Sequence, residues 1–296
     1  MRRHSSTFAA LVLALGSITT VSDCRSGSEP AAQPPTPATE SAPAQATDQS
    51  RAPAPIIEAV DAPDAPTRIL DPRADQVLRA MSTLLANTKS FAFEAEERFD
   101  EIPSGQPRTL LTNLRRVVVQ RPNRLAADAE GDTLSRSVWF DGQTFSVYDR
   151  SQNVYASIPV PGSIDNAIDT LSDKYDVSVP LADLLYGDPY AVLTEKVTYS
   201  RYLGLHRAAG VLCHHLVFAQ PTIEWQIWID AGEQPLVRQL AISYVREPGE
   251  PQYLASLTKW TLSPTIPDTI FTFEPPEGAA KVDAAALVPQ LPGGSE

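Results

Sequence analysis

Apolar and polar residues alternate along much of this chain, and the alternation is strongest in residues 211–245. Side chains of a strand point to opposite faces in turn, so the pattern predicts three successive β-strands, at 211–219, 224–230 and 236–245. The breaks between them contain Pro221, Gly232 and Pro235, which are typical of turns. Strands in series form an antiparallel sheet, and we expect this one to be curved with an apolar concave side.

The faces of these strands indicate how the sheet is covered. In the first strand both faces are largely apolar, with Val217 on one and Phe218 on the other. A strand of this kind is covered on both sides. In the second strand the apolar residues Trp225, Ile227 and Ile229 fall on one face. This apolar face is suited to holding a hydrophobic ligand.

A helix is predicted to begin the domain. Asp71 is a favourable N-cap and Pro72 suits the first helical position. Apolar residues then recur at helical spacing, at Val77, Leu78, Met81, Leu84 and Leu85. Strands are predicted next at 91–99, 109–120, 124–130, 138–140, 144–148 and 154–158. The pair Asp141-Gly142 is the strongest hairpin signal among them.

The middle of the chain changes character. Residues 163–175 have helical spacing, and residues 181–185 give another helical turn or two. Residues 194–202 fit a short helix or a strand, and residues 254–262 form the last predicted strand. The sum is an α+β domain in which a leading helix and a helical insertion cover the concave face of a long antiparallel sheet.

The N-terminus has the features of an export signal. Residues 1–4 are basic and residues 8–21 are apolar, a run shorter than the roughly 20 residues that span a bilayer. Residues 1–23 are therefore predicted to be a signal peptide. Cys24 stands where a lipoprotein signal places its lipidated cysteine, although Asp23 departs from the small residue expected before it. Lipidation of Cys24 and ordinary cleavage nearby both stay open, so the protein is expected to be membrane-anchored in the periplasm or exported as a soluble protein.

Composition sets the domain boundaries. Residues 24–66 are rich in Pro and Ala and lack apolar periodicity, which predicts a disordered tether. Residues 67–282 form the single domain, and residues 283–296 are expected to be a disordered tail. The formal net charge of −12 argues against nucleic-acid partners and against electrostatic docking on anionic lipid.

Histidines and a cysteine cluster in the strand at 211–219, where they suggest a metal site. Adjacent strand residues point to opposite faces, so His214 and His215 do not ligate one ion together. Cys213 shares a face with His215 and has His206 nearby, but no third and fourth ligand follow at a supporting spacing. A structural role is the better interpretation, with no metal and no cofactor expected. Because Cys24 lies in the signal region, the chain's two cysteines give the domain no disulfide framework.

Other catalytic and ion-binding patterns are weak. No G-x-S-x-G motif, phosphate-binding loop or dinucleotide fingerprint occurs in the sequence. The acidic residues Asp128, Glu130 and Asp132 alternate around Gly131 without the calcium-loop pattern, so a solvated turn is expected. The sequence offers no catalytic constellation, and a hydrolase is the least supported function.

The best candidates for lining a ligand cavity are apolar residues on predicted strands and on the helical insertion. They are Phe91, Phe93, Trp139, Leu184, Val217, Trp225, Ile227 and Ile229. A pocket for a lipid-sized ligand needs roughly 300–1,000 Å³. A concave face that encloses a cavity and one that is filled by side chains have the same apolar periodicity, so both arrangements fit this sequence.

Several motifs resemble a known family. They are His214-His215-Leu216, Trp225-Gln226-Ile227-Trp228-Ile229, Pro235-Leu236, Pro251-Gln252-Tyr253, Trp260 and Phe271-Thr272-Phe273-Glu274-Pro275-Pro276. The chain from about Asp71 to Lys281 resembles a family of predicted bacterial periplasmic proteins of unknown function. That family is similar in architecture to the lipoprotein carriers LolA and LolB, the mycobacterial lipoprotein LppX and the sensor domain of RseB.

The resemblance implies an open half-barrel of antiparallel strands, with helices at its mouth and a cavity for acyl chains. The first functional hypothesis is therefore a non-enzymatic periplasmic binding protein that holds an acyl chain, a lipid or a lipoprotein. The alternative is an RseB-like envelope sensor or regulatory module whose partner is another protein. The two differ in whether a hydrophobic ligand occupies the sheet.

Overall fold

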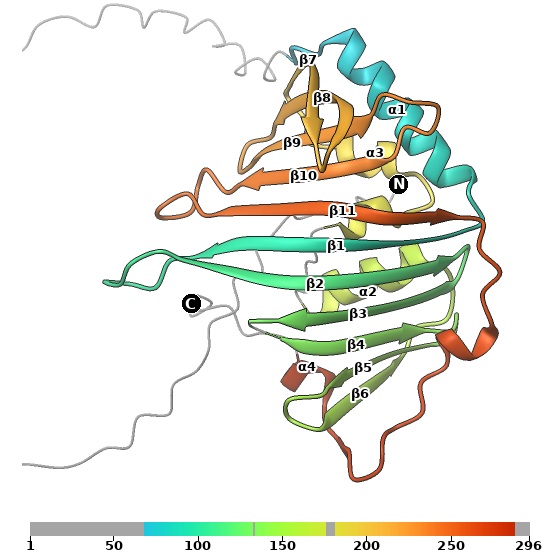
Figure 1. The fold of residues 1–296 in the computed structure, drawn as a ribbon. Coiled ribbons are helices and arrows are strands. Elements are labelled where there is room, and N and C mark those ends of the chain that lie inside the picture. Colours follow the sequence, from blue (N-terminus) through green and yellow to red (C-terminus); the bar gives the residue numbers. More distant parts are fainter. Residues whose placement is uncertain (1–67, 133, 176–180, 288–296) are drawn as a thin grey trace, which may run out of the picture. The chain divides into compact units, whose positions relative to one another are not determined.

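The computed structural model describes residues 68–132, 134–175 and 181–287. The predicted signal peptide, Cys24 and the predicted tether lie outside the described residues. Within these residues the chain is an α+β fold with one open 12-stranded sheet, which confirms the predicted fold class. The helices lie on one face of this sheet (Figure 1).

The first half of the chain supplies α1 and the first six strands. Their bounds are α1 Pro72–Asn87, β1 Ser90–Glu101, β2 Thr109–Gln120, β3 Arg124–Gly131, β4 Ser135–Phe140, β5 Thr144–Asp149 and β6 Val154–Pro159. The helical insertion follows as α2 Ile164–Tyr175, the 3₁₀ turn η1 Ala182–Leu184 and α3 Pro189–Thr194.

The second half returns to strands. Their bounds are β7 Tyr199–Ala208, β8 Val211–Ala219, β9 Glu224–Asp230, β10 Val237–Ser243 and β11 Gln252–Leu262. The 3₁₀ turn η2 Asp268–Phe271, the short strand β12 Ala280–Lys281 and the helix α4 Ala284–Leu287 end the described chain.

The sheet consists of two meanders joined in its middle. The strand order is β12-β6-β5-β4-β3-β2-β1-β11-β10-β9-β8-β7, so the first meander runs outward from β1 and the second ends beside it at β11. Neighbouring strands in the described chain pair antiparallel, except that β12 pairs in parallel with β6. The helical insertion lies between the two meanders in sequence, so one connection supplies cover for both halves.

Helix α1 is fixed at its N-terminus by the predicted cap. The Asp71 carboxylate accepts hydrogen bonds from the backbone N–H groups of Arg73 (2.8 Å) and Ala74 (3.3 Å). It also accepts one from the N–H of Tyr202 on β7 (2.9 Å), and this bond contributes most to lowering the pKa of Asp71. The cap therefore ties the start of the helix to the far edge of the sheet.

The meander β7–β11 is densely packed on the side that α1 covers. Leu78, Met81 and Leu85 of the helix are fully buried. Trp225 and large aliphatic side chains of the strands belong to the same buried cluster, and the Trp225 ring stacks on that of Phe218 on β8. Burial of side chains of this size is the main source of stability in a domain core.

Two predicted boundaries change. The segment 194–202, for which helix and strand were both open, contains the end of α3 at Thr194 and the start of β7 at Tyr199. Strand β7 exists because it forms a hairpin with β8 around Ala209 and Gly210, both at positive φ. The domain also continues past residue 282, because the buried side chain of Leu287 holds α4 against the fold.

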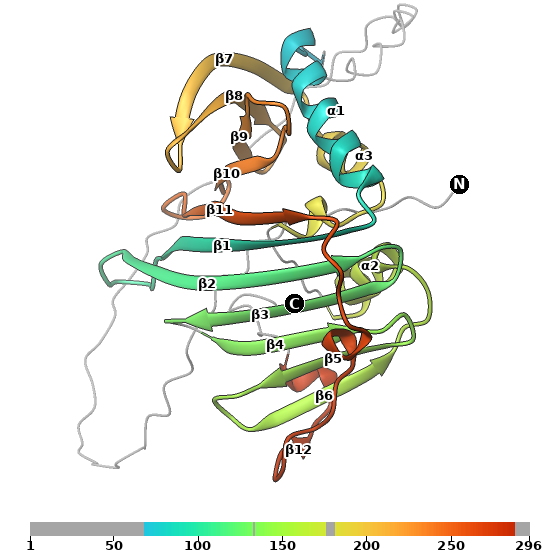
Figure 2. The ribbon, with the colours of Figure 1, turned by 45° about the vertical axis from the view of Figure 1, so that its right-hand side comes forward.

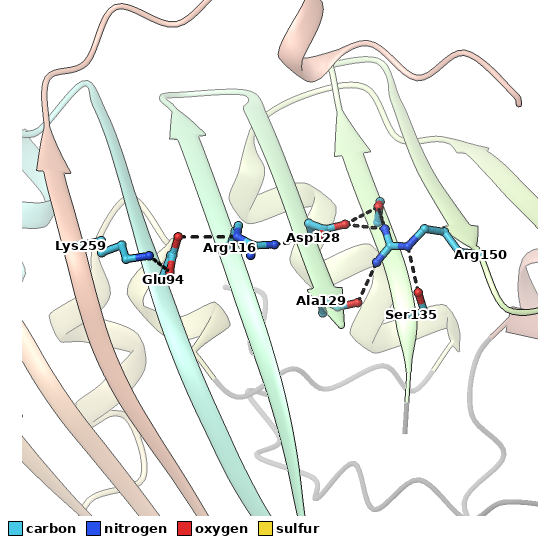
Figure 3. A network of polar contacts seen from close by, with 8 residues as sticks. Glu94, Arg116, Asp128, Ala129, Ser135, Arg150 and Lys259 are labelled. Atoms are coloured by element: carbon cyan, nitrogen blue, oxygen red, sulfur yellow. Dashed lines mark hydrogen bonds and ion pairs between the residues drawn. The ribbon is translucent and has the colours of Figure 1, made fainter. Parts of the chain in front are cut away.

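Figure 3 shows a chain of polar contacts that crosses neighbouring strands. Lys259 binds Glu94 at 2.7 Å, Glu94 and Asp128 lie 3.6 and 3.5 Å from the guanidinium of Arg116, and Asp128 also binds Arg150. Asp128 thus lies in strand β3, in agreement with the strand predicted at 124–130, and only Asp132 of the three acidic residues lies beyond that strand. Partly exposed ion pairs of this kind each contribute little stability. Their exposure shows that this face of the sheet is in contact with water.

A matched pair of substitutions tests the difference in packing between the two meanders. Ile229→Ala on β9 empties a fully buried position and should lower the free energy of unfolding by about 2–5 kcal/mol. Ile158→Ala on β6 changes a partly buried side chain and should cost about 1 kcal/mol. Urea unfolding of both variants measures the difference. Equal losses would contradict the described packing.

Candidate functional site

A cavity of about 220 Å³ lies on the inner face of the first meander. Its walls are strands β1–β6, helix α2, the turn around η1 and helix α4. Figure 2 shows α2 behind the strands β2 and β3. The cavity belongs to the half of the sheet that α1 does not cover.

The floor of the cavity is a register-matched row of small and branched side chains. Val117, Ala127, Val138, Val147 and Ala156 are direct neighbours across β2, β3, β4, β5 and β6. All five line the cavity. Two of the five are alanines, which fill much less of the space above the sheet than the leucine, isoleucine and tryptophan side chains of the other meander do.

Apolar side chains at the cavity wall are left partly exposed. Val138 and Val147 on the floor, and Ile168 and Leu171 on α2, are only half-buried although they face the interior of the fold. Apolar area left in contact with water costs about 25 cal/mol per Å² relative to burial. An apolar ligand that covers this surface would recover that free energy.

One end of the cavity is lined by a buried ion pair. Arg115 on β2 donates two hydrogen bonds to the Glu97 carboxylate, from Nε at 2.7 Å and from Nη2 at 3.1 Å. The Tyr253 hydroxyl donates a third to Glu97 at 2.8 Å. Burial opposes the charge on Arg115, but Glu97 outweighs it, so the pKa of Arg115 is raised. Arg115 is therefore a fixed cation in the cavity wall.

A second arginine lies two strands away. Arg136 on β4 donates from Nε to Asp149 at 2.8 Å and from Nη1 to the carbonyl of Leu287 at 2.9 Å. Burial opposes the charge on Asp149, while hydrogen bonds from Ser151 and Arg136 outweigh it and lower the pKa of that carboxyl. Arg136 thereby joins the start of β4 to α4.

Of the predicted cavity residues, Phe93 lines this cavity. Its ring lies 4.6 Å from that of Trp260 and 6.5 Å from that of Phe91. Leu184, Trp225 and Ile227 lie together around a much smaller cavity of about 10 Å³ beneath η1. A space of this size has room for about one water-sized sphere, so these three residues are packing residues of the filled half.

The remaining candidates lie elsewhere. Phe91 and Ile229 are fully buried in the core and line neither cavity. Trp139 alternates with the inward-facing Val138, so it lies on the outer face, where its ring is 4.9 Å from that of Phe273.

Val217 alternates with core residues Leu216 and Phe218 and likewise faces outward. Trp139 and Val217 thus face outward because successive side chains of a strand alternate between its two faces, whatever their size or polarity.

Most of the cavity wall consists of residues outside the predicted candidates. The missed residues include Ala127, Val138, Val147, Ala156 and Ile168, which lie on strands and a helix that the pattern did predict. The available signal was the alternation in 125–129 and 154–158, where alanine occupies inward positions. Small inward residues indicate a hollow, whereas large aromatic residues such as Trp225 fill the space between a sheet and its helices.

The histidines take separate structural roles, as their alternation predicts. His214 contacts the Tyr202 hydroxyl at 3.0 Å, whereas His215 contacts Gln226 at 2.9 Å and His206 at 2.8 Å. Burial is the main cause that lowers the pKa of His215. In the part of the chain that the structure describes, no group of three or more His, Cys, Asp or Glu residues could hold a metal ion.

An acidic group lies beside the smaller cavity. Oδ2 of Asp183 and Nε1 of Trp225 are both buried, and neither has a hydrogen-bond partner among the described residues. Burial raises the pKa of Asp183 to about 7, and the positive charge of Lys196 offsets only part of this effect. Asp183 therefore binds a proton more tightly in the folded protein than an exposed aspartate does.

Comparison with known proteins gives one family match. A family model described as "Predicted periplasmic protein (DUF2092)" matches residues 74–285. No curated protein matches the chain. None of the helices in the described segments is long and apolar enough to cross a bilayer.

The chain is also distantly similar to solved structures. An uncharacterized conserved protein from Thermus thermophilus is 11% identical over 71% of this chain and 99% of its own, with a TM-score of 0.43. Lipoprotein LppX from Mycobacterium tuberculosis is 15% identical over 66% and 98% (TM-score 0.38). A LolA superfamily protein from Nitrosomonas europaea is 10% identical over 68% and 97% (TM-score 0.33). With likeness this distant, any functional argument has to come from the cavity.

The environment of Asp183 predicts a pH dependence of stability. Because the folded pKa is raised above the ordinary value of 3.8, the stabilising proton is lost as pH rises toward 7 and beyond. Asp183→Asn mimics the protonated form. Between pH 5 and pH 8 the variant should gain about 2–3 kcal/mol in free energy of unfolding relative to the natural protein. Urea unfolding at both pH values measures this, and a difference independent of pH would contradict it.

Proposed function

The chain belongs to the DUF2092 family of predicted periplasmic proteins, and on that premise we propose that it is a non-enzymatic periplasmic binding protein. Its ligand is an apolar chain held in the cavity between α2 and strands β2–β6. The observation that supports this is the row of small residues facing half-buried apolar side chains across about 220 Å³. Binding is driven by removing ligand and cavity wall from water, worth about 0.8 kcal/mol per buried CH₂.

The size of the cavity narrows the ligand. A dry apolar cavity of about 150 Å³ is large enough to bind benzene, and pockets for drug-sized molecules start at roughly 300 Å³. The cavity lies between these values, which favours one acyl chain, or the end of one, over several chains held together. Among an acyl chain, a lipid and a lipoprotein, the volume supports a single chain of a lipid best.

The side chains at the cavity support a binding role over a catalytic one. Among the described residues that line it, Arg115, Arg136 and Tyr175 are the ones with polar side chains. Covalent catalysis by the serine or cysteine route requires a nucleophile beside a general base, and neither Ser, Cys nor His belongs to this wall. The cavity is therefore proposed to hold its ligand without transforming it.

Filling the cavity tests this function. The natural protein should take up phenylnaphthylamine, an uncharged dye whose fluorescence rises in apolar surroundings. Ala127→Phe places a ring on the cavity floor and should weaken dye binding at least about tenfold, because the ring occupies the ligand's volume. Fluorescence titration gives the dissociation constant.

The neighbouring residue provides the control. Ala126 lies on the same strand but outside the cavity, so Ala126→Phe should bind the dye as the natural protein does. If the natural protein takes up no dye, the binding function is wrong and an RseB-like protein-binding module becomes the better hypothesis. Equal loss in both variants would show a general disturbance of the sheet.

We also propose that lipidated Cys24 anchors the protein to a membrane. Cys24→Ser should move the protein from the membrane fraction to the soluble fraction after cell lysis. The control is Cys213→Ser at the other cysteine, which is buried in β8 and should leave the protein in the membrane fraction. A Cys24→Ser variant that stays with the membrane would refute the anchor.

A further inference from the structure

The two arginines of the cavity lie in one row across the sheet. Arg115 pairs with Ala129, and Ala129 pairs with Arg136 on its other side. Two strand spacings place the arginine backbones roughly 10 Å apart. The residue between them has only a methyl group. All three residues line the cavity, at the end where β3 continues into the exposed residues Glu130 and Gly131.

Each guanidinium is held by a carboxylate at the outer side of the row. Glu97 lies on β1, beyond Arg115, and Asp149 lies on β5, beyond Arg136. The order across the sheet is thus acid, arginine, alanine, arginine, acid. Both arginine side chains are largely buried, with exposed fractions of 18% and 20%. They are therefore positioned before any ligand arrives.

Each arginine also has one terminal guanidinium nitrogen that its hydrogen bonds to a carboxylate or a carbonyl do not use. Glu97 uses Nε and Nη2 of Arg115, and Asp149 and the Leu287 carbonyl use Nε and Nη1 of Arg136. These hydrogen bonds among the described residues leave Nη1 of Arg115 and Nη2 of Arg136 unused. Fixed guanidinium donors at the end of an apolar cavity match planar or tetrahedral oxyanions.

We propose that Arg115 and Arg136 form a headgroup site for an anionic amphiphile, with its carboxylate or phosphate above Ala129 and its chain along the cavity floor. This inference rests on the proposed function, because the chain requires the cavity. From Ala129 to Leu125 on β3 the floor extends over roughly 13 Å, and the far row of Leu125, Phe145 and Ile158 is apolar. The site is charged at one end and apolar at the other.

The natural protein can be tested with four decyl probes that differ in headgroup. Displacement of phenylnaphthylamine by decanoate, decyl phosphate, decanol and decyltrimethylammonium gives four dissociation constants at one pH. The anionic probes should bind at least about tenfold more tightly than decanol, and the cation should bind most weakly. The order of decanoate and decyl phosphate distinguishes a fatty acid from a phospholipid as the source of the headgroup.

The outcomes separate the two claims. Equal affinity for all four probes would overturn the headgroup site and leave the apolar cavity as proposed. This result is what arginines that serve only to neutralise Glu97 and Asp149 would give. If none of the probes displaces the dye and the dye itself does not bind, the proposed function fails, and the headgroup site fails with it.

A double variant tests whether the preference for an anionic headgroup depends on Arg136. Arg136→Gln combined with Asp149→Asn removes the pair together, so no carboxylate is left buried without its partner. Decanoate affinity should fall about tenfold while decanol affinity stays unchanged. The control is Arg116→Gln, next to Arg115 on β2 but directed to the polar network of Figure 3, which should alter neither affinity. Equal loss for decanoate and decanol would contradict the assignment.

Discussion

The volume of the inward side chains differs between the two halves of one sheet, and the rest of the structure depends on this difference. In the half that α1 covers, the meander β7–β11 presents Trp225, Ile227 and other large residues, and the cavity beside these two is about 10 Å³. Beneath α2, the inward positions of β3 and β6 include Ala127 and Ala156, and the interior stays hollow. Apolar side chains are buried in both halves, and the hollow half also keeps apolar surface available to a ligand.

The hollow half of the sheet also has buried charged groups, and they lie at one end of the cavity. Charged groups are costly to bury unless they are paired and hydrogen-bonded. Glu97 meets this requirement with Arg115 and Tyr253, and Arg136 meets it with Asp149. The opposite face carries the partly exposed ion pairs of Figure 3. The sheet thus separates a solvated charged face from an inner face that is apolar except at one end.

Periodicity predicted the elements well because each one depends on local signals. Asp71 and Pro72 specify the start of α1, and the alternation in 211–219 and 224–230 matches β8 and β9. The cavity was harder to place because it depends on what is missing between elements. Trp139 and Val217 have the apolar character of cavity residues, yet strand alternation places them on the outer face. The alanines of the cavity floor give only a weak periodic signal because their side chains are small. The half of the sheet that α1 covers depends on a tertiary contact, the hydrogen bond from the Tyr202 N–H to the Asp71 carboxylate. Local sequence patterns do not contain this information.

The most direct test of the account is a crystal structure of the domain under xenon pressure. Xenon enters apolar cavities that are empty or easily dried, and its anomalous scattering identifies each site without a model of the ligand. Xenon should bind between α2 and the row Val117, Ala127, Val138, Val147 and Ala156, and it should not bind beneath α1. Side chains of α2 filling that space, or xenon bound only beneath α1, would contradict it.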